Sequence, residues 1–263
     1  MLRPRIIPCL LIKDKGLVKT INFKNPKYVG DPINAVRIFN EKEVDELIVL
    51  DIDATLENRA PDFKIIENLA AECRMPLCYG GGVKTVEQAK IILGLGVEKI
   101  AISSAAIENP SLVNEASQCI GNQSVVVVLD VKKSSILGKY EIWTHNGRKN
   151  TKKNPIEFAT KLEKLGVGEI VINSIDNDGV MKGYDVVLVD KIRESVRVPI
   201  TLLGGAGSLD HLGQLIKKYR VLGLAAGSLF VFKGVYRAVL INYPNREEKD
   251  KLIQKSLDSS NYR

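Results

Sequence analysis

The fold is decided by one stretch near the middle of the chain, Ser124-Val125-Val126-Val127-Val128-Leu129-Asp130. The five apolar residues from Val125 to Leu129 leave this strand without a polar face, so both of its faces have to be covered. A parallel sheet with helices on both sides meets that requirement. The acid that ends the run, Asp130, then stands at the carboxyl end of a buried strand.

Similar short apolar runs recur along the chain with amphipathic segments between them. The predicted strands cover residues 5–12, 46–51, 76–79, 99–103, 124–130, 169–174, 199–203 and 221–226. Helical i, i+3, i+4 spacing is clearest in residues 32–42, 85–95, 155–165 and 208–219. Eight alternating units predict an α/β protein with a (β/α)8 TIM barrel, and an open doubly wound sheet is the alternative.

An internal repeat favours the barrel. Landmarks of the first half recur 123 residues later, pairing Glu46 with Glu169, Asp53 with Asp176, Pro76 with Pro199 and Gly81-Gly82 with Gly204-Gly205. The repeat predicts two pseudo-symmetric half-barrels, about 1–122 and 123–244, within a single domain. Residues 245–263 are polar and are expected to form a terminal helix and tail.

Composition limits the classes of protein that need consideration. The chain has 263 residues, 45% of them hydrophobic and 26% charged, which excludes disordered and fibrous classes. Its longest nearly apolar stretch, Val221 to Phe232, is much shorter than the ~18 residues of a membrane span, so we expect neither a membrane segment nor a signal peptide. The net charge of +7 suggests anionic ligands, but no basic run is interleaved with aromatic residues as in nucleic-acid binding proteins.

Cysteines and histidines give no sign of a metal or cofactor site. The four cysteines, Cys9, Cys73, Cys78 and Cys119, lack C-x-x-C spacing and mostly lie in apolar segments. We expect them to be buried thiols in a reducing compartment, which predicts a cytoplasmic protein. The two histidines stand far apart without nearby ligand types, so we expect no metal and no cofactor.

Glycine-rich loops follow two of the predicted strands. Gly80-Gly81-Gly82 follows the third strand and Gly204-Gly205-Ala206-Gly207 the seventh, each just before a helix, where backbone N–H groups can meet a phosphate. Each has a neighbouring loop with hydroxyl groups, Ser103-Ser104 in one half and Gly227-Ser228 in the other. The pair predicts a long substrate with a phosphate at each end, and the alternative is that the glycines only form tight turns.

Acids at the same ends of the strands are candidates for proton transfer. Asp130 is the strongest candidate, because a carboxyl that leaves a dry strand is tuned for acid or base work; a helix cap or an ion pair with a nearby lysine is the alternative. The other candidates each have a structural alternative as well: Asp51, Asp176, Asp178 and, for a phosphate, Lys19 in the long first loop. The half-barrel comparison places Leu11 where symmetry expects a second carboxylate, and a leucine moves no proton.

Charged residues begin four otherwise apolar strands at the opposite end of the barrel. They are Arg5, Glu46, Lys99 and Glu169, two of each sign. They predict a salt-bridged ring across the barrel bottom. Such a ring stabilises the barrel, and a polar plug would also let a small polar molecule enter.

Over nearly its whole length the chain resembles the cyclase subunit of imidazole glycerol phosphate synthase, the HisF family. The stretches that carry the resemblance are Arg5-Ile6-Ile7-Pro8-Cys9-Leu10, Gly30-Asp31-Pro32, Asp45-Glu46-Leu47, Tyr79-Gly80-Gly81-Gly82, Glu108-Asn109-Pro110-Ser111-Leu112, Gly147-Arg148-Lys149-Asn150, Ser174-Ile175-Asp176 and Leu203-Gly204-Gly205-Ala206-Gly207. The related isomerase of the histidine pathway shares the half-barrels, but the N-terminal segment and the Gly147–Asn150 loop fit the cyclase better.

The resemblance implies a barrel that docks a glutaminase subunit on its N-terminal face. Ammonia would pass through the barrel and react at the C-terminal face with a bisphosphorylated ribulosyl aminoimidazole carboxamide nucleotide. The products would be imidazole glycerol phosphate and an aminoimidazole carboxamide ribotide. Arg5, Glu46, Lys99 and Glu169 match the family's ammonia gate, Asp130 matches one of its two catalytic aspartates, and the glycine loops match its phosphate sites.

The chain departs from the family pattern at the mouth and keeps the pattern at the gate. Leu11 stands in place of the other catalytic aspartate, Ser103 replaces an Asn, Asn173 a Thr, and Leu203 a small polar residue. The segments 16–20, 40–43 and 226–232 are similar to a second-copy subgroup associated with surface-polysaccharide assembly. Two hypotheses follow: a cyclase that relies on Asp130, and an ammonia-conducting subunit that serves an amidotransferase forming an amidino sugar.

Overall fold

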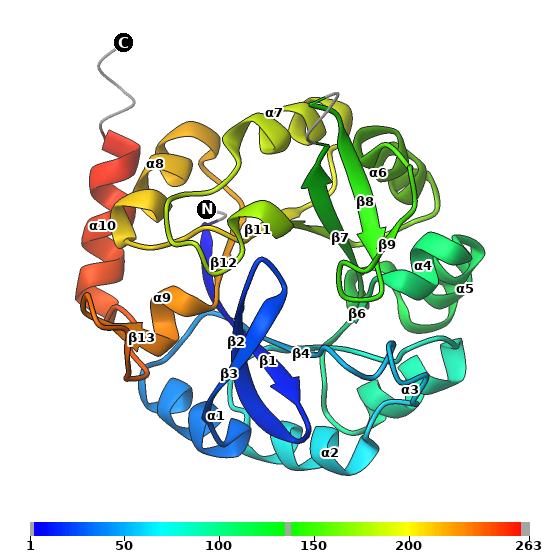
Figure 1. The fold of residues 1–263 in the computed structure, drawn as a ribbon, viewed down its shortest axis with the longest axis horizontal. Helices are drawn as coiled ribbons and strands as arrows, with labels where there is room; N and C mark the ends of the chain where they lie inside the picture. The colour runs from blue at the N-terminus through cyan, green and yellow to red at the C-terminus, as the bar shows by residue number, and fades with distance from the viewer. Residues whose placement is uncertain (1–2, 135–137, 259–263) are drawn as a thin grey trace.

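Eight parallel strands form a closed hydrogen-bonded ring in the structure, a computed structural model that describes residues 3–134 and 138–258 (Figure 1). In ring order they are β1 (Arg5–Lys13), β4 (Leu47–Asp51), β5 (Leu77–Gly80), β6 (Lys99–Ile102), β7 (Val125–Lys133), β10 (Glu169–Ser174), β11 (Ile200–Leu203) and β12 (Gly223–Ala226). Pairing of β12 with β1, and of β7 with β10, closes the ring. The predicted (β/α)8 barrel is confirmed, and the open-sheet alternative is wrong.

Helices surround the ring on its outside (Figure 1). They are α1 (Pro32–Glu41), α2 (Phe63–Glu72), α3 (Val86–Gly94), α4 (Ser104–Glu108), α5 (Ser111–Ile120), α6 (Pro155–Lys164), α7 (Val186–Ser195), α8 (Leu209–Tyr219), α9 (Ser228–Val231) and α10 (Arg246–Asp258), with short 3-10 turns η1 (Asn122–Ser124) and η2 (Ile175–Asn177). The predicted helices over 32–42, 85–95, 155–165 and 208–219 coincide with α1, α3, α6 and α8 within a residue or two.

Local sequence explains where these helices begin. The side chain of Asp31 accepts a hydrogen bond from Asn34 N–H, and Pro32 occupies the first helical position of α1. At the start of α3, Thr85 and Gln88 cap each other's backbone N–H groups. These caps satisfy donors that the first helical turn leaves unpaired, so each connection from strand to helix ends at a defined residue.

Alternation along the strands divides the core into two clusters. Residues such as Ile6, Leu10 and Val127 point outward and pack against the helices. The opposite set points inward and forms a second cluster, here called the lumen cluster, of Ile7, Cys9, Ile48, Cys78, Ala101, Val126, Val128, Val171, Leu203 and Ala225. The interior of the barrel is therefore packed with apolar and thiol side chains.

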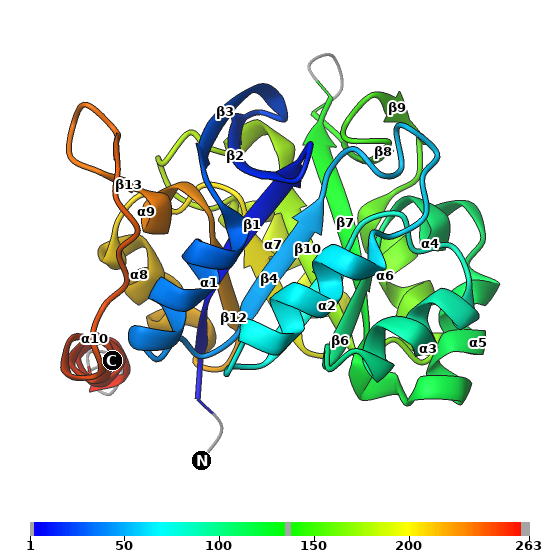
Figure 2. The same ribbon diagram turned by 90° about the horizontal axis from the view of Figure 1, so that it is seen from below.

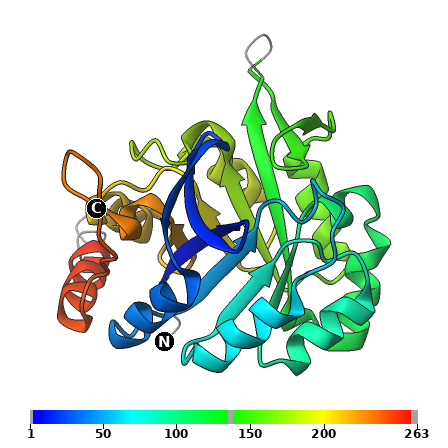
Figure 3. The same ribbon diagram turned by 60° about the horizontal axis from the view of Figure 1, so that its bottom comes forward.

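Three hairpins were not predicted from the sequence. They are β2 (Gly16–Ile21) with β3 (Lys24–Gly30), β8 (Tyr140–Thr144) with β9 (Lys149–Asn150), and β13 (Phe232–Lys233) with β14 (Ala238–Val239). Figures 2 and 3 show all three at one end of the barrel, while the chain enters β1 from the other end. The end that carries the hairpins is the C-terminal face, because the barrel strands run toward it.

The chain ends in a polar helix beside the barrel. Helix α10 packs on α8 (Figure 1), and Ile253 on α10 is buried. Residues 259–263 of the expected tail lie outside the described residues, and the half-barrel boundary near residue 122 stays a prediction. Among the helices of residues 3–134 and 138–258, none is long and apolar enough to cross a membrane.

Gly223 on β12 tests how tightly the barrel packs. A Cβ at Gly223 would stand 1.7 Å from Thr201 Oγ1 on the neighbouring strand. We expect Gly223→Ala to lower the free energy of unfolding by about 1–3 kcal/mol, because the interior has no room for the methyl group. Urea denaturation measures the change, and the cost should shrink but persist when Thr201→Ala is also present, because Thr201 Cβ would still stand 2.8 Å from the new methyl group.

Gly94 at the end of α3 provides the control, since a Cβ there has no heavy atom within 4 Å. Gly94→Ala should leave stability unchanged or raise it by up to about 1 kcal/mol. Equal losses in Gly94→Ala and Gly223→Ala would contradict the steric explanation.

Candidate functional site

Four charged side chains close the N-terminal end of the barrel. Arg5 pairs with Glu46 and, at 2.7 Å, with Glu169; Lys99 Nζ lies 2.9 Å from Glu46 and 3.0 Å from Glu169. Each cation therefore bridges both carboxylates, and a closed ring results. Thr201 adds a hydrogen bond from its hydroxyl to Glu169. The ring expected from the sequence is formed, and we call these four residues the charged ring.

The charges of the ring stabilise one another despite burial. Glu46 and Glu169 are only 3% and 5% exposed. Burial acts to raise the pKa of Glu169, but Arg5, Lys99 and the Thr201 hydroxyl together hold that pKa below its usual value. Burial likewise acts to lower the pKa of Lys99, and Glu169 and Glu46 outweigh it. Arg5, Lys99 and Glu169 thus stay charged at neutral pH.

The lumen cluster separates the charged ring from the opposite end of the barrel. Its members are all apolar or thiol side chains, and most of them are less than 5% exposed. A charged species would lose its hydration along this path, whereas a small neutral molecule would lose little. The interior is therefore a less costly environment for an uncharged molecule than for an ion.

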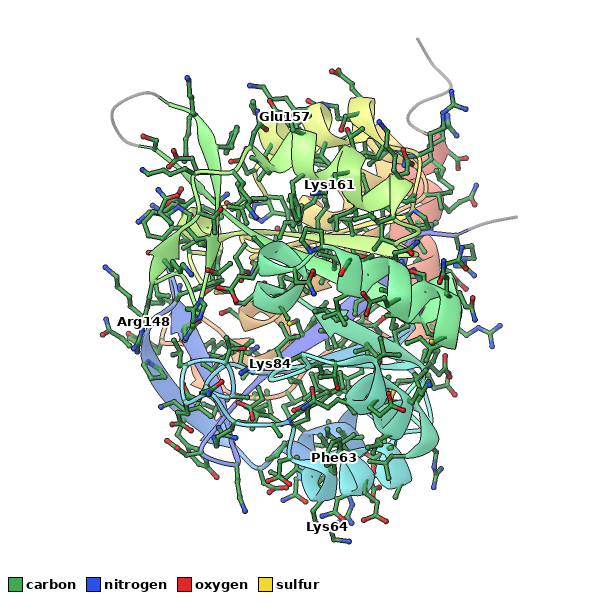
Figure 4. The ribbon with its side chains drawn as sticks, turned by 90° about the vertical axis from the view of Figure 1, so that its right-hand side faces the viewer. Phe63, Lys64, Lys84, Arg148, Glu157 and Lys161 are labelled. Carbon is green, nitrogen blue, oxygen red and sulfur yellow. The ribbon has the colours of Figure 1, made fainter. Side chains whose placement is uncertain are left out.

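A cavity of about 580 Å³ opens at the C-terminal face above the lumen cluster. The strand ends, the β2–β3 hairpin and the β8–β9 turn surround it (Figure 1). Arg148 on the β8–β9 turn and Lys84 after the first glycine loop mark this side of the molecule in Figure 4. Lys84 lines the cavity and donates a hydrogen bond to Asn58 Oδ1.

The cavity collects almost every side chain that the sequence predicted for the mouth. It is lined by Lys19, Asp51, Gly81, Gly82, Ser103, Ser104, Asp130, Asp178, Gly204, Gly205, Gly227 and Ser228. Asp176 does not line it; its carboxylate accepts a hydrogen bond from Lys133 N–H on β7 instead, at 2.9 Å. Asp176 thus has a turn-forming role, which was the structural alternative to a role in the site.

The two glycine loops need glycine for their backbone geometry. Gly81 has φ +127° and Gly204 has φ +91°, and a Cβ at either would stand 2.6 Å from a carbonyl oxygen, of Asp51 and of Ser174 respectively. The same close contact at related positions in the two halves brings bare backbone to the cavity wall twice. Both loops precede helix starts, where exposed N–H groups and the helix dipole favour an anion.

Asp130 lies on β7 between the two strands that flank it. Asn173 on β10 donates from Nδ2 to Asp130 Oδ1 at 2.9 Å, and Ser103 follows β6 on the other side. Within the described residues Asp130 caps no helix and forms no ion pair with Lys132 or Lys133. Asn173 was noted in the sequence only as a departure from the family pattern, and its register opposite Asp130 gives it a place in the site.

Burial raises the pKa of Asp130 to about 7, and the nearby charge of Asp178 adds to the shift while the Asn173 amide opposes it. A carboxyl with this pKa is present in both protonation states near neutral pH. It can therefore accept a proton at one step and donate one at another.

Lys19 reaches the second half of the mouth from the β2–β3 hairpin. It is 5% exposed, its Nζ donates to the Cys9 carbonyl, and it lies so near Gly227 that a Cβ there would be 2.5 Å away. Burial lowers the pKa of Lys19 and raises that of Asp178, whose carboxylate accepts from Thr20 Oγ1 at 2.8 Å. An additional anion beside Lys19 would complete the pairing of this buried cation.

Asp51 and Ser104 also hold the loops in place. Asp51 accepts hydrogen bonds from the backbone N–H groups of Asp53 and Ala54, at 3.1 and 3.0 Å. These bonds give it the structural role that was the alternative to a functional one. Ser104 Oγ accepts from His145 N–H on the β8–β9 turn. Both residues still line the cavity, so either role is compatible with their positions.

Leu11 lines the cavity near the end of β1, with Leu50 beside it on β4. Both leucines pack against the lumen cluster. This wall of the mouth is therefore apolar, and β1 supplies no second carboxyl group to the mouth beside Asp130.

One group of three carboxylates in the described residues could hold a metal ion, Asp14, Asp53 and Glu57. Lys13 already pairs with two of its members, with Nζ 2.7 Å from Asp53 and 3.5 Å from Asp14. Cys9 and Cys78 are buried as expected, but the prediction is wrong for Cys119, which lies exposed on α5. The helix turns that position to solvent together with the adjacent Gln118.

The histidine biosynthesis protein family matches residues 5–237. A Vibrio vulnificus protein provisionally named imidazole glycerol phosphate synthase subunit hisF3 is 56% identical over 97% of this chain and 98% of its own. A Leptospira interrogans protein provisionally named subunit HisF is 57% identical over 96% of this chain and all of its own.

A Clostridium botulinum protein, named imidazole glycerol phosphate synthase subunit HisF without that qualification, is 39% identical over 94% of this chain and 98% of its own. Both the family match and the relatives extend over nearly the entire barrel. The chain belongs to the histidine biosynthesis protein family, and the resemblance to the HisF proteins is confirmed.

The buried acid gives a prediction about stability and pH. Asp130 ionises near pH 7 in the folded protein but near its ordinary value of 3.8 in the unfolded chain. The folded state therefore loses stability as pH rises from about 4 to about 7. Asp130→Asn cannot ionise, so its stability relative to wild type should rise by about 1–4 kcal/mol over that range. Urea denaturation at pH 4.5 and 8 measures this, and parallel pH profiles would contradict it.

The charged ring gives a second prediction. Lys99→Met should lower the free energy of unfolding by about 3–5 kcal/mol at pH 7, because two buried carboxylates then share one cation. The loss should shrink at low pH, where a carboxylate can take up a proton. Lys218→Met is the control, since Lys218 pairs with Asp190 at the surface and should cost about 0–1 kcal/mol. Similar losses in the two variants would argue against a buried, coupled ring.

Proposed function

We propose that this chain is the cyclase subunit of an imidazole glycerol phosphate synthase. In this proposal it uses ammonia to convert a phosphoribulosyl aminoimidazole carboxamide nucleotide into imidazole glycerol phosphate and aminoimidazole carboxamide ribotide. The observation that carries the proposal is the position of Asp130 in a cavity walled by two glycine loops, at the end of an apolar lumen. The names of the relatives support the same activity.

The two glycine loops would hold the two phosphates of the substrate. Gly81-Gly82 and Ser103-Ser104 offer one pocket, and Gly204-Gly205, Gly227-Ser228 and Lys19 offer the other. A bisphosphate that spans the mouth would lay its middle across Asp130. Two fixed ends orient the reacting atoms, which lowers the entropy cost of reaction.

Ammonia would come from a glutaminase partner on the N-terminal face. The charged ring would meet it first, and the lumen cluster would carry it as a neutral molecule. At the mouth the ammonia nitrogen attacks a carbonyl carbon of the substrate, the C=O π bond opens onto the oxygen, and the positively charged nitrogen then loses a proton. Asp130 in its acid form would donate a proton to that oxygen, and the resulting carboxylate would accept the proton from nitrogen, which a pKa of about 7 permits.

Leu11 favours a second candidate function. An acid–base partner contributes roughly 10²–10⁴-fold to a rate, and the wall around Leu11 and Leu50 is apolar. A barrel with an intact ring and lumen but weak acid–base chemistry would serve as an ammonia conduit. In that case the acceptor would be a separate amidotransferase, such as one that forms an amidino group on a sugar.

The test measures turnover of the purified protein with the ribulosyl bisphosphate nucleotide and a high concentration of ammonium salt. We expect measurable turnover in wild type, a rise of about 10²-fold in Leu11→Asp, and loss in Asp130→Asn. Turnover in wild type supports the cyclase. Turnover only in Leu11→Asp favours the conduit with a retained binding site.

Leu50→Asp is a matched control, because Leu50 stands opposite Leu11 in the strand register and lines the same cavity. It introduces an acid at similar depth but on β4, so we expect no gain. A similar gain in Leu50→Asp would mean that added charge in the mouth, and not the position on β1, explains the effect.

A further inference from the structure

Asn173 has an unpaired oxygen that points away from Asp130. The residue is 5% exposed, and among the described residues its Oδ1 has no hydrogen-bond partner. This oxygen lies 3.2 Å from the place where a Cβ on Gly204 would stand. A buried acceptor therefore faces the second glycine loop, on the side of β10 opposite Asp130.

An anion at that loop would raise the free-energy cost of leaving this oxygen unpaired. An unpaired buried amide oxygen already costs about 1–3 kcal/mol, and its partial negative charge would repel a phosphate or sulfate at Gly204-Gly205. Rotation of the amide by 180° keeps its shape and exchanges oxygen for nitrogen. The NH2 group would then face the anion and could donate to it.

The same rotation changes the contact with Asp130. In the structure Asn173 Nδ2 donates to Asp130 Oδ1 at 2.9 Å, which suits an ionised carboxylate. After rotation the amide oxygen would face the carboxylate, and two acceptors would meet. A proton on Asp130 removes the conflict, because its O–H then donates to the amide oxygen.

We propose that Asn173 is a two-position relay that couples an anion at Gly204-Gly205 to protonation of Asp130. With the site empty the amide donates to the ionised carboxylate. With an anion bound the amide donates to the anion and accepts from the protonated acid. Asn173 is a positioning residue, and the inference rests on the anion site of the proposed function but not on the cyclase reaction.

The relay gives Asp130 the proton that it needs once substrate is present. A second phosphate would bind at Gly204-Gly205, and the acid beside it would become a proton donor. Because the pKa of Asp130 is about 7, a modest interaction energy is enough to change its state near neutral pH. An acid–base site with a single carboxyl would thus bind substrate in the acid form.

Other charged groups face the same residues and have to be separated from the relay. Asp178 and Cys9 lie near Asp130, and Lys19 lies beyond them. At the loop itself, His211 Nδ1 accepts from Gly207 N–H at 3.1 Å, so this side chain also lies beside the anion site. Asp130→Asn keeps this histidine and removes only the carboxyl.

Sulfate is the probe, because its charge does not change between pH 5.5 and 8.5. In the full chain, 13C NMR follows the Asp130 carboxyl carbon with and without sulfate, and the Gly204 and Gly205 amide signals locate the anion. We expect sulfate to raise the pKa of Asp130 by at least about one unit, which equals about tenfold tighter binding at low pH than at high pH.

Asn173→Leu removes both ends of the relay at similar volume. We expect sulfate still to bind, with a pH dependence that falls to the level of Asp130→Asn. Wild-type pH dependence in Asn173→Leu would overturn the relay and leave direct charge repulsion between anion and acid as the cause. If the variant does not fold, the side-chain NH2 signals of Asn173 in wild type decide: they should move on sulfate addition with the same pH midpoint as Asp130, and unmoved signals overturn the relay.

The outcomes also separate this inference from the proposed function. No sulfate shift at Gly204 and Gly205 at any pH would overturn the anion site and the relay with it. A relay that works in a protein without cyclase turnover would support this inference and count against the cyclase.

Discussion

Backbone hydrogen bonds from β12 to β1 and from β7 to β10 close the barrel, and the register of that ring positions every side chain of the site. Side chains alternate between the helices and the interior, so a slip of one residue would move Asp130 and Asn173 to the wrong side. With the observed register, three neighbouring strands bring Ser103, Asp130 and Asn173 together at one end. At the other end the same register brings together the ion pairs of the charged ring.

The barrel interior has three zones along its axis. Ion pairs close the bottom, apolar and thiol side chains fill the middle, and polar groups with bare backbone line the top. The ring can keep its charges because each ion has two partners, whereas a single buried charge in the middle would have none. This order separates the entry of a small neutral molecule from the binding of a large anion, and each end can change without altering the other. Leu11 and Leu203, which depart from the pattern that the resemblance to the HisF family implies, both lie at the mouth.

The strands of the barrel could be predicted from the sequence because buried parallel strands read as short apolar runs. The hairpins could not: Lys24–Gly30 is mostly exposed, and its residues lack the alternation that marks a half-buried strand. Position at a strand end was enough to place Asp130 and Asp178 at the mouth, but Asp176, two residues from Asp178, turns outward. Asn173 was missed as a site residue because its role depends on the neighbouring strand that carries Asp130. The sequence of one strand does not show which strand lies beside it.

The β2–β3 hairpin contacts a part of the chain that is synthesised much later. Thr20 on this hairpin bonds to Asp178, and Asn22 N–H donates to the Asp178 carbonyl at 2.9 Å, so the mouth needs residues separated by 158 positions. A nascent chain that has emerged only through β7 therefore has no complete binding site. Ligands of the mouth select the fully folded barrel, and the stabilisation that they give grows with the logarithm of their free concentration above the Kd. In a cell, the supply of substrate would then protect this protein from unfolding and proteolysis.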